Sequence, residues 1–474
     1  MRTMRAFLPQ RLRRAACSCS RARDALDFSD YSMAYQHKSL WELVRALGVL
    51  KVCSYDWLVD NSQWFLIAGE RLLGRRLLGA LVGPTFYRQF VGGATPQEMR
   101  ACVDRLAASR VRTMVACSLE DEEDSAQRGE AGAASASQRR VAMYGRNGEK
   151  VLSCLRMTSQ LCSESPMMQV KMSGLLPPKL LAHLTRIFDS SEKPELIVSC
   201  LGDAISSESY REYSDLQLEN CDHNFVQLAL RKLRSVCQTA KDAGVTILVD
   251  AEYANMNGGI ELLGLALMAA FNERAPLVWN TYQCYLTDTP DKLSRHLRLA
   301  DYIGCSFGVK LVRGAYMDGE RRKAREHGEA HTVCSSYRMT NENYDRVLRY
   351  LLAHISRSER ECRLVVATHN EDSIRTATTR MQELGLAVND KRISFGQLLG
   401  MYDHITFPLA ARGYNVYKSI PYGPLTDLLL YLARRASENR SVLSSPVVER
   451  RMLASEIRRR LTASWKRPLE QAHD

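Results

Sequence analysis

The pattern of hydrophobic and polar positions changes along the chain. From about Glu164, short apolar runs alternate with longer segments in which apolar residues recur every three or four positions. Short runs of this kind are typical of buried parallel strands, and the longer segments of amphipathic helices. Seven runs predict strands, at residues 167–173, 245–252, 277–285, 308–316, 363–370, 392–399 and 414–421.

Repeated strand and helix units predict an α/β fold with a parallel sheet. We expect an eighth, weakly marked strand near residues 331–337, which would complete a distorted (βα)8 barrel of the TIM type. The last predicted helix would close over the barrel mouth. An open, doubly wound sheet is the alternative arrangement.

The remaining regions predict the domain organisation. Residues 38–118 have the periodicity of helices, residues 119–141 combine an acidic block with Ala, Ser and Gly and predict a disordered linker, and residues 142–445 would form the barrel. A basic helix or tail would occupy residues 446–474.

Residues 40–91 alternate apolar runs with arginines, as in L-I-A-G-E-R-L-L-G-R-R-L-L-G-A-L-V-G. Two interpretations fit equally well: an amphipathic helix lying on a membrane surface, and a helix packed on the main domain by its Leu face. No run of eighteen apolar residues occurs, so a membrane-spanning helix is not expected.

Charge and cysteine content narrow the class of protein. The net charge is +12, but residues 1–23 contain seven arginines and no acidic residue, so most of the excess lies there. We interpret residues 1–30 as a mitochondrial transit peptide, with a disordered basic tail as the alternative, and expect no nucleic-acid partner. The fourteen cysteines form no C-x-x-C pair, which favours reduced thiols over a zinc site or a disulfide framework. We predict no metal site.

Polar residues end several predicted strands. Asp250, Lys310, His369 and Gln397 all stand at or near the carboxyl ends of apolar runs. Parallel barrels place their active sites at that end, so these side chains are expected around one mouth. No G-x-G-x-x-G motif follows a strand, which argues against a Rossmann dinucleotide site.

Residues 414–439 begin as a strand, break at a Pro-Tyr-Gly turn and continue as a helix. Tyr431, Arg434 and Arg435 share one helix face, where two guanidiniums would form a fork for a carboxylate. The alternative is a surface helix in which the arginines pair with Glu438.

This segment, with I-P-Y-G-P followed by Y-L-x-R-R-x-x-E-N, resembles the closing helix of the proline dehydrogenase family. Further motifs of that family recur in order: V-K-M-S at 170–173, V-D-A-E-Y at 249–253, N-T-Y-Q-C-Y-L at 280–286, K-L-V-R-G-A-Y-M at 310–317, A-T-H-N at 367–370 and F-G-Q-L-L-G-M at 395–401. The resemblance covers roughly residues 166–442 and implies a barrel that binds FAD and oxidises proline or hydroxyproline.

The resemblance implies a role for each matched residue. Asp250 and Lys310 would act at the catalytic centre, with Lys310 facing flavin N5. The substrate contacts implied are Lys171, Arg434 and Arg435 for the carboxylate and Tyr316, Leu398 and Tyr431 for the ring. The flavin contacts implied, besides Lys310, are Ala251, Asn280, Arg313, Gly314, Ala315, Thr368, His369, Gln397 and Glu438.

Several of these residues have simpler interpretations. Asp250 would equally pair with Lys310 or Lys171 as a buried ion pair. Lys310 and Arg313 are three positions apart, so in a straight strand their side chains point to opposite faces. Both face a cofactor only if the chain bends near Gly314.

His369, with Thr368 and Asn370, would also serve as a cap at the end of a strand. A lyase with a Schiff base on Lys310 and a membrane-associated scaffold are the alternative functions.

Ser419 bears on which substrate the family resemblance implies. Proline-specific members have a tyrosine at the position that Ser419 occupies in Y-K-S-I-P-Y-G. A small hydroxyl residue leaves room for a ring hydroxyl and offers it a hydrogen bond, so we expect a preference for trans-4-hydroxy-L-proline. The alternative is that Ser419 merely ends the strand and Tyr422 takes the aromatic role.

The resemblance also implies a quinone acceptor and a mitochondrial matrix enzyme with peripheral contact to the inner membrane.

Overall fold

The computed structural model describes residues 26–119, 136–162, 164–207, 223–327, 332–441 and 445–470. Eight parallel strands form a closed barrel in which each strand pairs with the next along the chain and β8 pairs with β1. The barrel prediction is therefore confirmed. The strands are β1 (Val111–Cys117), β2 (Met167–Val170), β3 (Thr246–Val249), β4 (Val278–Gln283), β5 (Phe307–Val312), β6 (Cys362–Ala367), β7 (Ile393–Leu398) and β8 (Val416–Tyr422).

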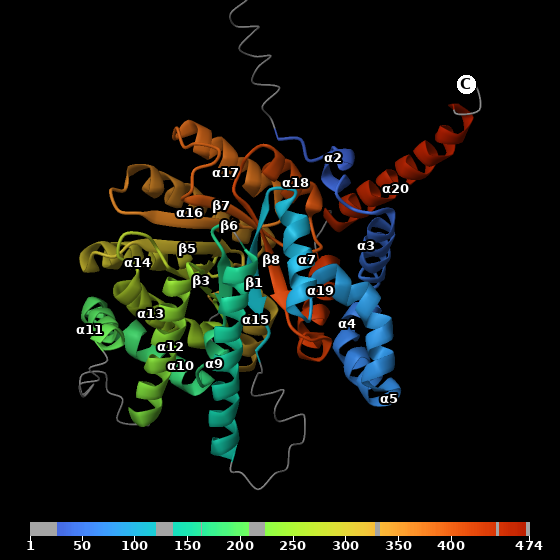
Figure 1. Cartoon of the computed structure of the whole chain (residues 1–474). Coiled ribbons are helices and arrows are strands. Elements are labelled where there is room, and N and C mark those ends of the chain that lie inside the picture. The colour runs from blue at the N-terminus through green and yellow to red at the C-terminus, as the bar shows by residue number, and fades with distance from the viewer. Residues whose placement is uncertain are drawn as a thin grey trace, which may run out of the picture.

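Helices surround the barrel and extend it on one side (Figure 1). Those between the strands are α9 (Ala136–Leu161), η2 (Met172–Gly174), α10 (Pro178–Ser190), α11 (Pro194–Ser207), α12 (His223–Ala243), α13 (Ala254–Phe271), α14 (Thr289–Ile303), α15 (Met317–His327), α16 (Tyr337–Arg357), α17 (Glu371–Glu383) and α18 (Asp403–Ala411). Before β1 lie α2 (Tyr31–Tyr35), α3 (Leu40–Val52), α4 (Asp56–Asp60), α5 (Ser62–Val82), η1 (Gly83–Tyr87), α6 (Arg88–Phe90) and α7 (Pro96–Ala107). After β8 come η5 (Leu425–Asp427), α19 (Leu429–Ser441) and α20 (Ser445–Glu470).

The seven strands predicted from apolar runs are all present, but the eighth prediction is wrong. Near residues 331–337 the described residues form only an isolated bridge between Leu286 and Val333. The missing strand is β1, within the segment predicted to be helical and before residue 142, where we expected the barrel to begin. Its seven residues follow a long helical stretch, and only pairing with β2 and β8 distinguishes them.

The predicted linker at 119–141 lies largely outside the described residues, but α9 begins at Ala136. Residues 1–25 of the predicted transit peptide also lie outside them. Leu26 and Phe28 are buried, and the Arg375 guanidinium donates to the Leu26 carbonyl. The expected boundary at residue 30 therefore falls inside the folded part of the chain.

The amino-terminal end of the barrel interior is filled by side chains. The inward-facing residues there are Met114, Met167, Leu248, Trp279, Val365 and Tyr417. A Cβ on Gly308 would lie 2.2 Å from the Trp279 ring, so the bulky indole fits only because residue 308 is glycine. These side chains close the amino-terminal end of the barrel interior, so the barrel is open at its carboxyl end.

Helix α13 is long and apolar enough to cross a membrane by length and composition, but most of it is buried inside the molecule. It packs against α10, α11 and β4. Since its apolar surface is already covered, α13 is a core helix of the barrel.

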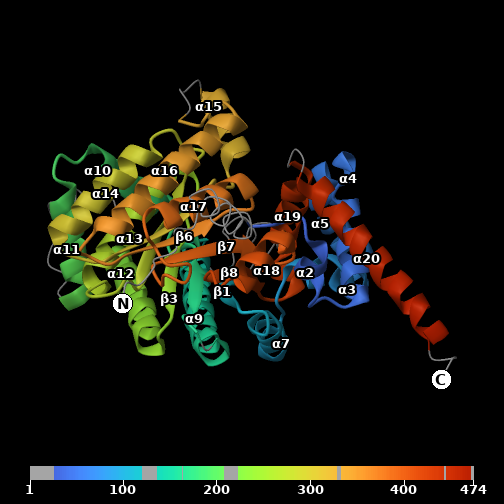
Figure 2. The same cartoon turned by 90° about the horizontal axis from the view of Figure 1, so that it is seen from above.

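The helices α3, α4 and α5 lie with α20 on one side of the barrel, next to α19 (Figures 1 and 2). Their attachment includes a buried charge cluster. The Asp403 carboxylate pairs with the Lys38 ammonium at 2.7 Å and the Lys418 ammonium at 2.8 Å. Burial alone would raise the pKa of Asp403, but these two cations lower it well below its usual value. The cluster fastens the N-terminal segment to β8 and α18.

Candidate active site

A cavity of about 1020 Å3 opens at the carboxyl ends of the strands. Nearly all predicted site residues line it: Lys171, Asp250, Ala251, Lys310, Arg313, Gly314, Ala315, Tyr316, Thr368, His369, Gln397, Leu398, Ser419, Tyr431, Arg434, Arg435 and Glu438. They come from six strands or strand ends and from α19. The barrel thus gathers residues that are up to 267 positions apart in the sequence.

Asn280 is the exception and corrects the sequence prediction. Its neighbours Trp279 and Thr281 face the barrel interior, so Asn280 faces outward. Its amide donates to the Glu261 carbonyl at 3.0 Å, and a Cβ on Gly264 would lie 1.8 Å from its side-chain oxygen. Asn280 therefore packs strand β4 against α13 and does not contact the cavity.

Lys310 lies at the centre of a hydrogen-bonded network. Its buried ammonium pairs with the Asp250 carboxylate and donates to the side-chain oxygen Oε1 of Gln169 at 2.9 Å. The Gln169 amide in turn donates to the Ser419 hydroxyl at 2.6 Å. The ion pair that sequence analysis gave as the simpler interpretation of Asp250 is therefore present, at the edge of the cavity.

Gln169 and Gln283 also line the cavity, although neither was among the site residues predicted from the sequence. The alternation of side chains between the two faces of a strand would have indicated both residues. Gln169 stands two residues before Lys171 on β2, and Gln283 stands two residues after Thr281 on β4, so each shares its neighbour's face.

The chain bends where we predicted it must for Lys310 and Arg313 to face one cavity. Strand β5 ends at Val312, and Gly314 adopts a φ of 113°, which disfavours other residues. A Cβ on Gly314 would also lie 2.0 Å from the Tyr285 ring. Both requirements explain a glycine at this position.

The bend directs the Arg313 guanidinium to three neutral acceptors: Thr368 Oγ1 at 2.5 Å, Asn341 Oδ1 at 2.7 Å and Ser373 Oγ at 2.8 Å. It also lies 4.3 Å from the Tyr344 ring centroid. No carboxylate pairs with it among the described residues. The arginine is thus rigidly placed by neutral groups, and the Asp345 carboxylate is linked to it only through the Ser373 hydroxyl.

His369 is a half-buried neutral base just after β6. Its Nε2 accepts a hydrogen bond of 3.0 Å from the Leu398 N–H, and its ring stacks on Tyr402 at 4.5 Å. Burial, helped by nearby cations, lowers the pKa of His369 well below its usual value. Thr368 accepts from the Asn370 N–H at 3.0 Å, and Asn370 caps α17. The strand-end cap is therefore real, although both Thr368 and His369 also line the cavity.

The two arginines of α19 differ in their surroundings. Arg435 is buried, donates to Glu438 at 2.7 Å and lies 4.7 Å from the Tyr431 ring centroid. Its Nε and the Tyr431 hydroxyl are buried without a hydrogen-bond partner in the described part of the chain. Arg434 is exposed to the cavity and forms no ion pair with any described residue. The pairing with Glu438 expected for a surface helix holds for Arg435 alone.

Lys171 and Tyr316 are held by neighbours at the ends of β2 and β5. The buried Glu252 carboxylate accepts from the Ser173 N–H at 2.9 Å, which fixes the loop after Lys171, and burial raises the pKa of Glu252. The Tyr316 ring lies 4.5 Å from that of Tyr253, and burial raises its pKa. The site therefore combines cations with aromatic walls.

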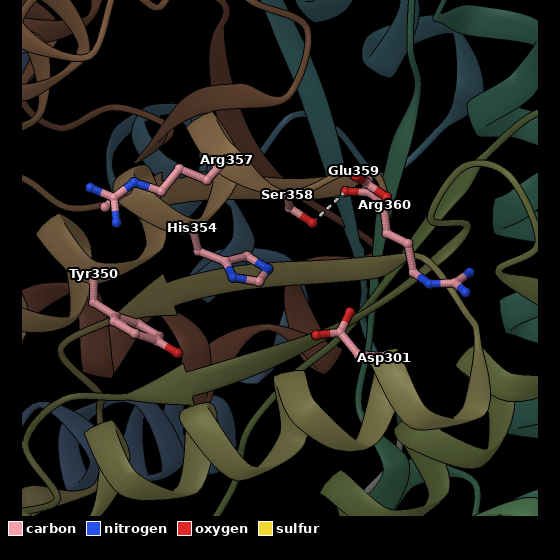
Figure 3. A pocket seen from close by; sticks show the side chains of 8 residues that line it. Asp301, Tyr350, His354, Arg357, Ser358, Glu359 and Arg360 are labelled. Atoms are coloured by element: carbon pink, nitrogen blue, oxygen red, sulfur yellow. Dashed lines mark hydrogen bonds between the residues drawn. The ribbon is translucent and has the colours of Figure 1, made fainter.

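A second hollow of about 570 Å3 lies between α14 and α16 (Figure 3). It includes Asp301, Tyr350, His354 and Arg360, and the Arg360 guanidinium donates to the Gly304 carbonyl. These residues precede β5 and β6, so the hollow is at the opposite end of the barrel from the strand-end polar groups. Among the described residues, no group of His, Cys, Asp or Glu side chains is arranged to hold a metal ion.

A family model described as proline dehydrogenase matches residues 105–446. The chain belongs to the proline dehydrogenase family. The match begins just before β1, which agrees with the barrel seen in the structure.

Members of this family named hydroxyproline dehydrogenase are similar over nearly the whole chain. The protein from Bos taurus is 42% identical, covering 90% of this chain and 92% of the relative, and the one from Homo sapiens is 39% identical, covering 92% and 94%. The human protein named proline dehydrogenase 1, mitochondrial, is 29% identical over 92% of this chain and 90% of its own.

The fold is also found in solved structures. Proline utilization A from Bdellovibrio bacteriovorus aligns with a TM-score of 0.58 at 18% identity, covering 88% of this chain and 38% of that one. At this identity the comparison supports the barrel fold alone.

Proposed function

We propose that the protein is an FAD-dependent dehydrogenase that oxidises trans-4-hydroxy-L-proline, and L-proline more slowly, to the corresponding 1-pyrroline-5-carboxylate. The observation that carries the proposal is one cavity with three cations, Lys171, Arg434 and Arg435, and a small hydroxyl residue, Ser419, in place of an aromatic side chain. The similarity to proteins named hydroxyproline dehydrogenase supports the same substrate. The family match gives no support to the lyase and scaffold alternatives.

The cavity residues fit a flavin dinucleotide. The volume of about 1020 Å3 exceeds what an imino acid alone requires, and the Arg313 guanidinium, which pairs directly with no described carboxylate, suits a phosphate group. Lys310, Ala251, Gly314, Ala315, Thr368, His369 and Gln397 would complete the contacts. When bound, a flavin supplies the hydride acceptor for oxidation of the carbon beside the substrate nitrogen.

The side chains would position the substrate and stabilise charge. Arg434, Arg435 and Lys171 would hold the carboxylate through charge-assisted hydrogen bonds. The orphaned Nε of Arg435 and hydroxyl of Tyr431 are donors that a ligand would satisfy. The apolar surfaces of Tyr316, Leu398 and Tyr431 would then orient the ring.

Lys310 would stabilise the negative charge that reduction leaves beside it. Its position is set by Asp250 and Gln169, so both would act as positioning residues. Glu438, predicted as a cofactor contact, also orients Arg435.

The direct test is to purify the protein, identify its flavin by absorption and mass, and compare anaerobic bleaching by the two imino acids. We expect a yellow protein that hydroxyproline bleaches faster than proline. A colourless protein with no bound flavin would refute the cofactor. Faster bleaching by proline would refute the substrate while leaving the family assignment intact.

We further propose a quinone as electron acceptor and a mitochondrial matrix location with peripheral contact to the inner membrane. The names of the related proline dehydrogenases support a mitochondrial location. A reporter fused to residues 1–35 should enter mitochondria, and replacing Arg11, Arg13 and Arg14 with Glu should prevent entry. Cytosolic residence of the intact fusion would refute the targeting role.

A further inference from the structure

Helix α5 is a hairpin of two shorter helices. The chain reverses at Gly74, whose φ of 74° and ψ of 163° interrupt the helix between residues 62–73 and 75–82. A Cβ on Gly69 would lie 3.2 Å from the Leu78 side chain, so the two arms pack against each other through a small residue. In Figures 1 and 2, α4 and α5 lie at the outer side of the helical unit next to α19.

The hairpin exposes most of its large apolar side chains. Leu78 is buried, but Leu72 at the tip is 83% exposed and Trp64 is 63% exposed. The other exposed side chains of this surface, here called the hairpin patch, are Trp57, Leu73, Leu77 and Leu81. Soluble proteins rarely leave so many neighbouring apolar side chains in water, so a partner is expected to cover them.

The charge at the tip indicates the kind of partner. Arg71 and Arg76 are exposed on the two arms beside Gly74 and form no ion pair with any described residue. Leucines flanked by arginines, with tryptophans along the sides, match the composition of segments that lie in a bilayer interface, where Trp prefers the headgroup level and Arg meets anionic lipid.

We propose that the hairpin patch inserts into the interface of an anionic lipid bilayer. From the sequence, a helix packed on the protein and a helix lying on a membrane were equally compatible with this segment. In the structure the arms pack on each other through Gly69 and Leu78, while the side chains of the hairpin patch are exposed. This proposal rests on the membrane contact proposed above and assigns that contact to particular residues. It does not depend on which substrate the enzyme oxidises.

The location of the patch has a consequence for turnover. Helix α19, which carries Arg434 and Arg435, contacts both α4 and α5. Insertion of the patch would therefore bring the helix that lines the cavity next to the bilayer. An acceptor dissolved in the lipid would reach the enzyme from that side, whereas the imino acid would enter from water.

The test uses the purified flavin-loaded protein and sedimentation with vesicles of phosphatidylcholine alone or mixed with cardiolipin. We expect binding to the mixed vesicles and a blue shift of tryptophan fluorescence. Leu72→Ser with Leu77→Ser should weaken binding at least about tenfold, because the apolar contribution to interfacial binding is lost. Arg71→Gln with Arg76→Gln should remove the preference for cardiolipin.

The control is Leu196→Ser on α11, which is 56% exposed and lies outside the hairpin patch. It should bind vesicles as the wild type does. All variants should keep wild-type turnover with a water-soluble dye acceptor, which separates this proposal from the proposed catalytic function. Equal vesicle binding by wild type and the leucine variant would overturn the proposal, as would loss of a dimer in that variant without change in vesicle binding.

Discussion

The Gln169 side chain joins Ser419 to Lys310 through its two amide atoms. Because an ammonium only donates, the Gln169 oxygen must face Lys310 and its NH2 must face Ser419, at 2.9 and 2.6 Å. The amide therefore occupies an acceptor site of the Ser419 hydroxyl and leaves that hydroxyl free to donate into the cavity. The group proposed to select the substrate and the group proposed to act at the reacting centre are thus held by one residue.

Ser419→Tyr should shift specificity from hydroxyproline toward proline. A phenol ring would fill the space that we assign to the 4-hydroxyl, and the serine hydroxyl that donates to it would be lost, at a cost of about 1–3 kcal/mol for hydroxyproline relative to proline. The measurement is kcat/KM for both substrates. An unchanged ratio would show that Ser419 does not select the substrate. Ser419→Ala is the control, because it removes the hydrogen bond to the substrate without filling the space beside it.

Gln169→Leu should weaken hydroxyproline use more than proline use, because Ser419 would rotate and Lys310 would lose one acceptor. We expect a rise in KM for hydroxyproline of about tenfold, equivalent to about 1.4 kcal/mol, the scale of one hydrogen bond. Flavin content should stay normal. If both substrates are affected equally, Gln169 acts through Lys310 alone.

Arg434→Ala and Arg435→Ala should each weaken substrate use by about 2–3 kcal/mol, since a carboxylate would lose a charge-assisted partner. Arg435→Lys should also be damaging because an ammonium does not reproduce the planar fork. Substrate titrations monitored by flavin bleaching would measure this. Loss of flavin with normal substrate affinity would contradict the assignment.

Gly314→Ala should yield protein with little bound flavin. The added methyl group would collide with the Tyr285 ring at a φ of 113°, and the resulting shift would displace Arg313. Gly385→Ala is the matched control, because Gly385 also has a positive φ, 68°, but a Cβ there would meet no described atom within 4 Å. Gly385→Ala should lose about 1–2 kcal/mol of stability from backbone strain, and Gly314→Ala should lose more because of the added steric overlap. The flavin-to-protein ratio of the folded protein should fall only in Gly314→Ala.

His296 should make the fold sensitive to acid. Burial lowers its pKa from 6.5 to about 3, and its Nδ1 lies 2.9 Å from the Tyr282 hydroxyl. Between pH 6.5 and 3 the unfolded chain binds a proton at this residue that the folded protein does not, so stability is complete above pH 6.5 and falls by about 1.4 kcal/mol per pH unit below it.

His296→Gln should reduce this dependence while keeping a hydrogen-bond partner for Tyr282. Urea unfolding of both proteins at pH 7.5 and 5.5 measures the effect, since the other titrating groups are common to both. Equal losses of stability between the two pH values would show that His296 does not titrate as proposed.

The sequence by itself determined most of the barrel and the composition of its mouth. Apolar runs located seven strands, because burial on both faces requires uninterrupted hydrophobic residues. Ordered motifs indicated the family, and the position of polar residues at strand ends predicted which side chains would meet. Even the bend at Gly314 followed from the opposite parity of Lys310 and Arg313.

Other features were decided only by tertiary structure. Strand β1 is defined by pairing with β2 and β8, and the partner positions on β8 lie about three hundred residues away. Asn280 faces outward because Trp279 and Thr281 are the residues of β4 that face the barrel interior. The motif N-T-Y-Q-C-Y-L does not show which alternate residues face inward. The network of Gln169, Ser419 and Lys310 joins three strands, and the exposure of Leu72 depends on the reversal at Gly74. For β1 and for the Gln169 network the deciding interaction is between distant segments, and the local sequence does not show which segments the closure of the barrel brings together.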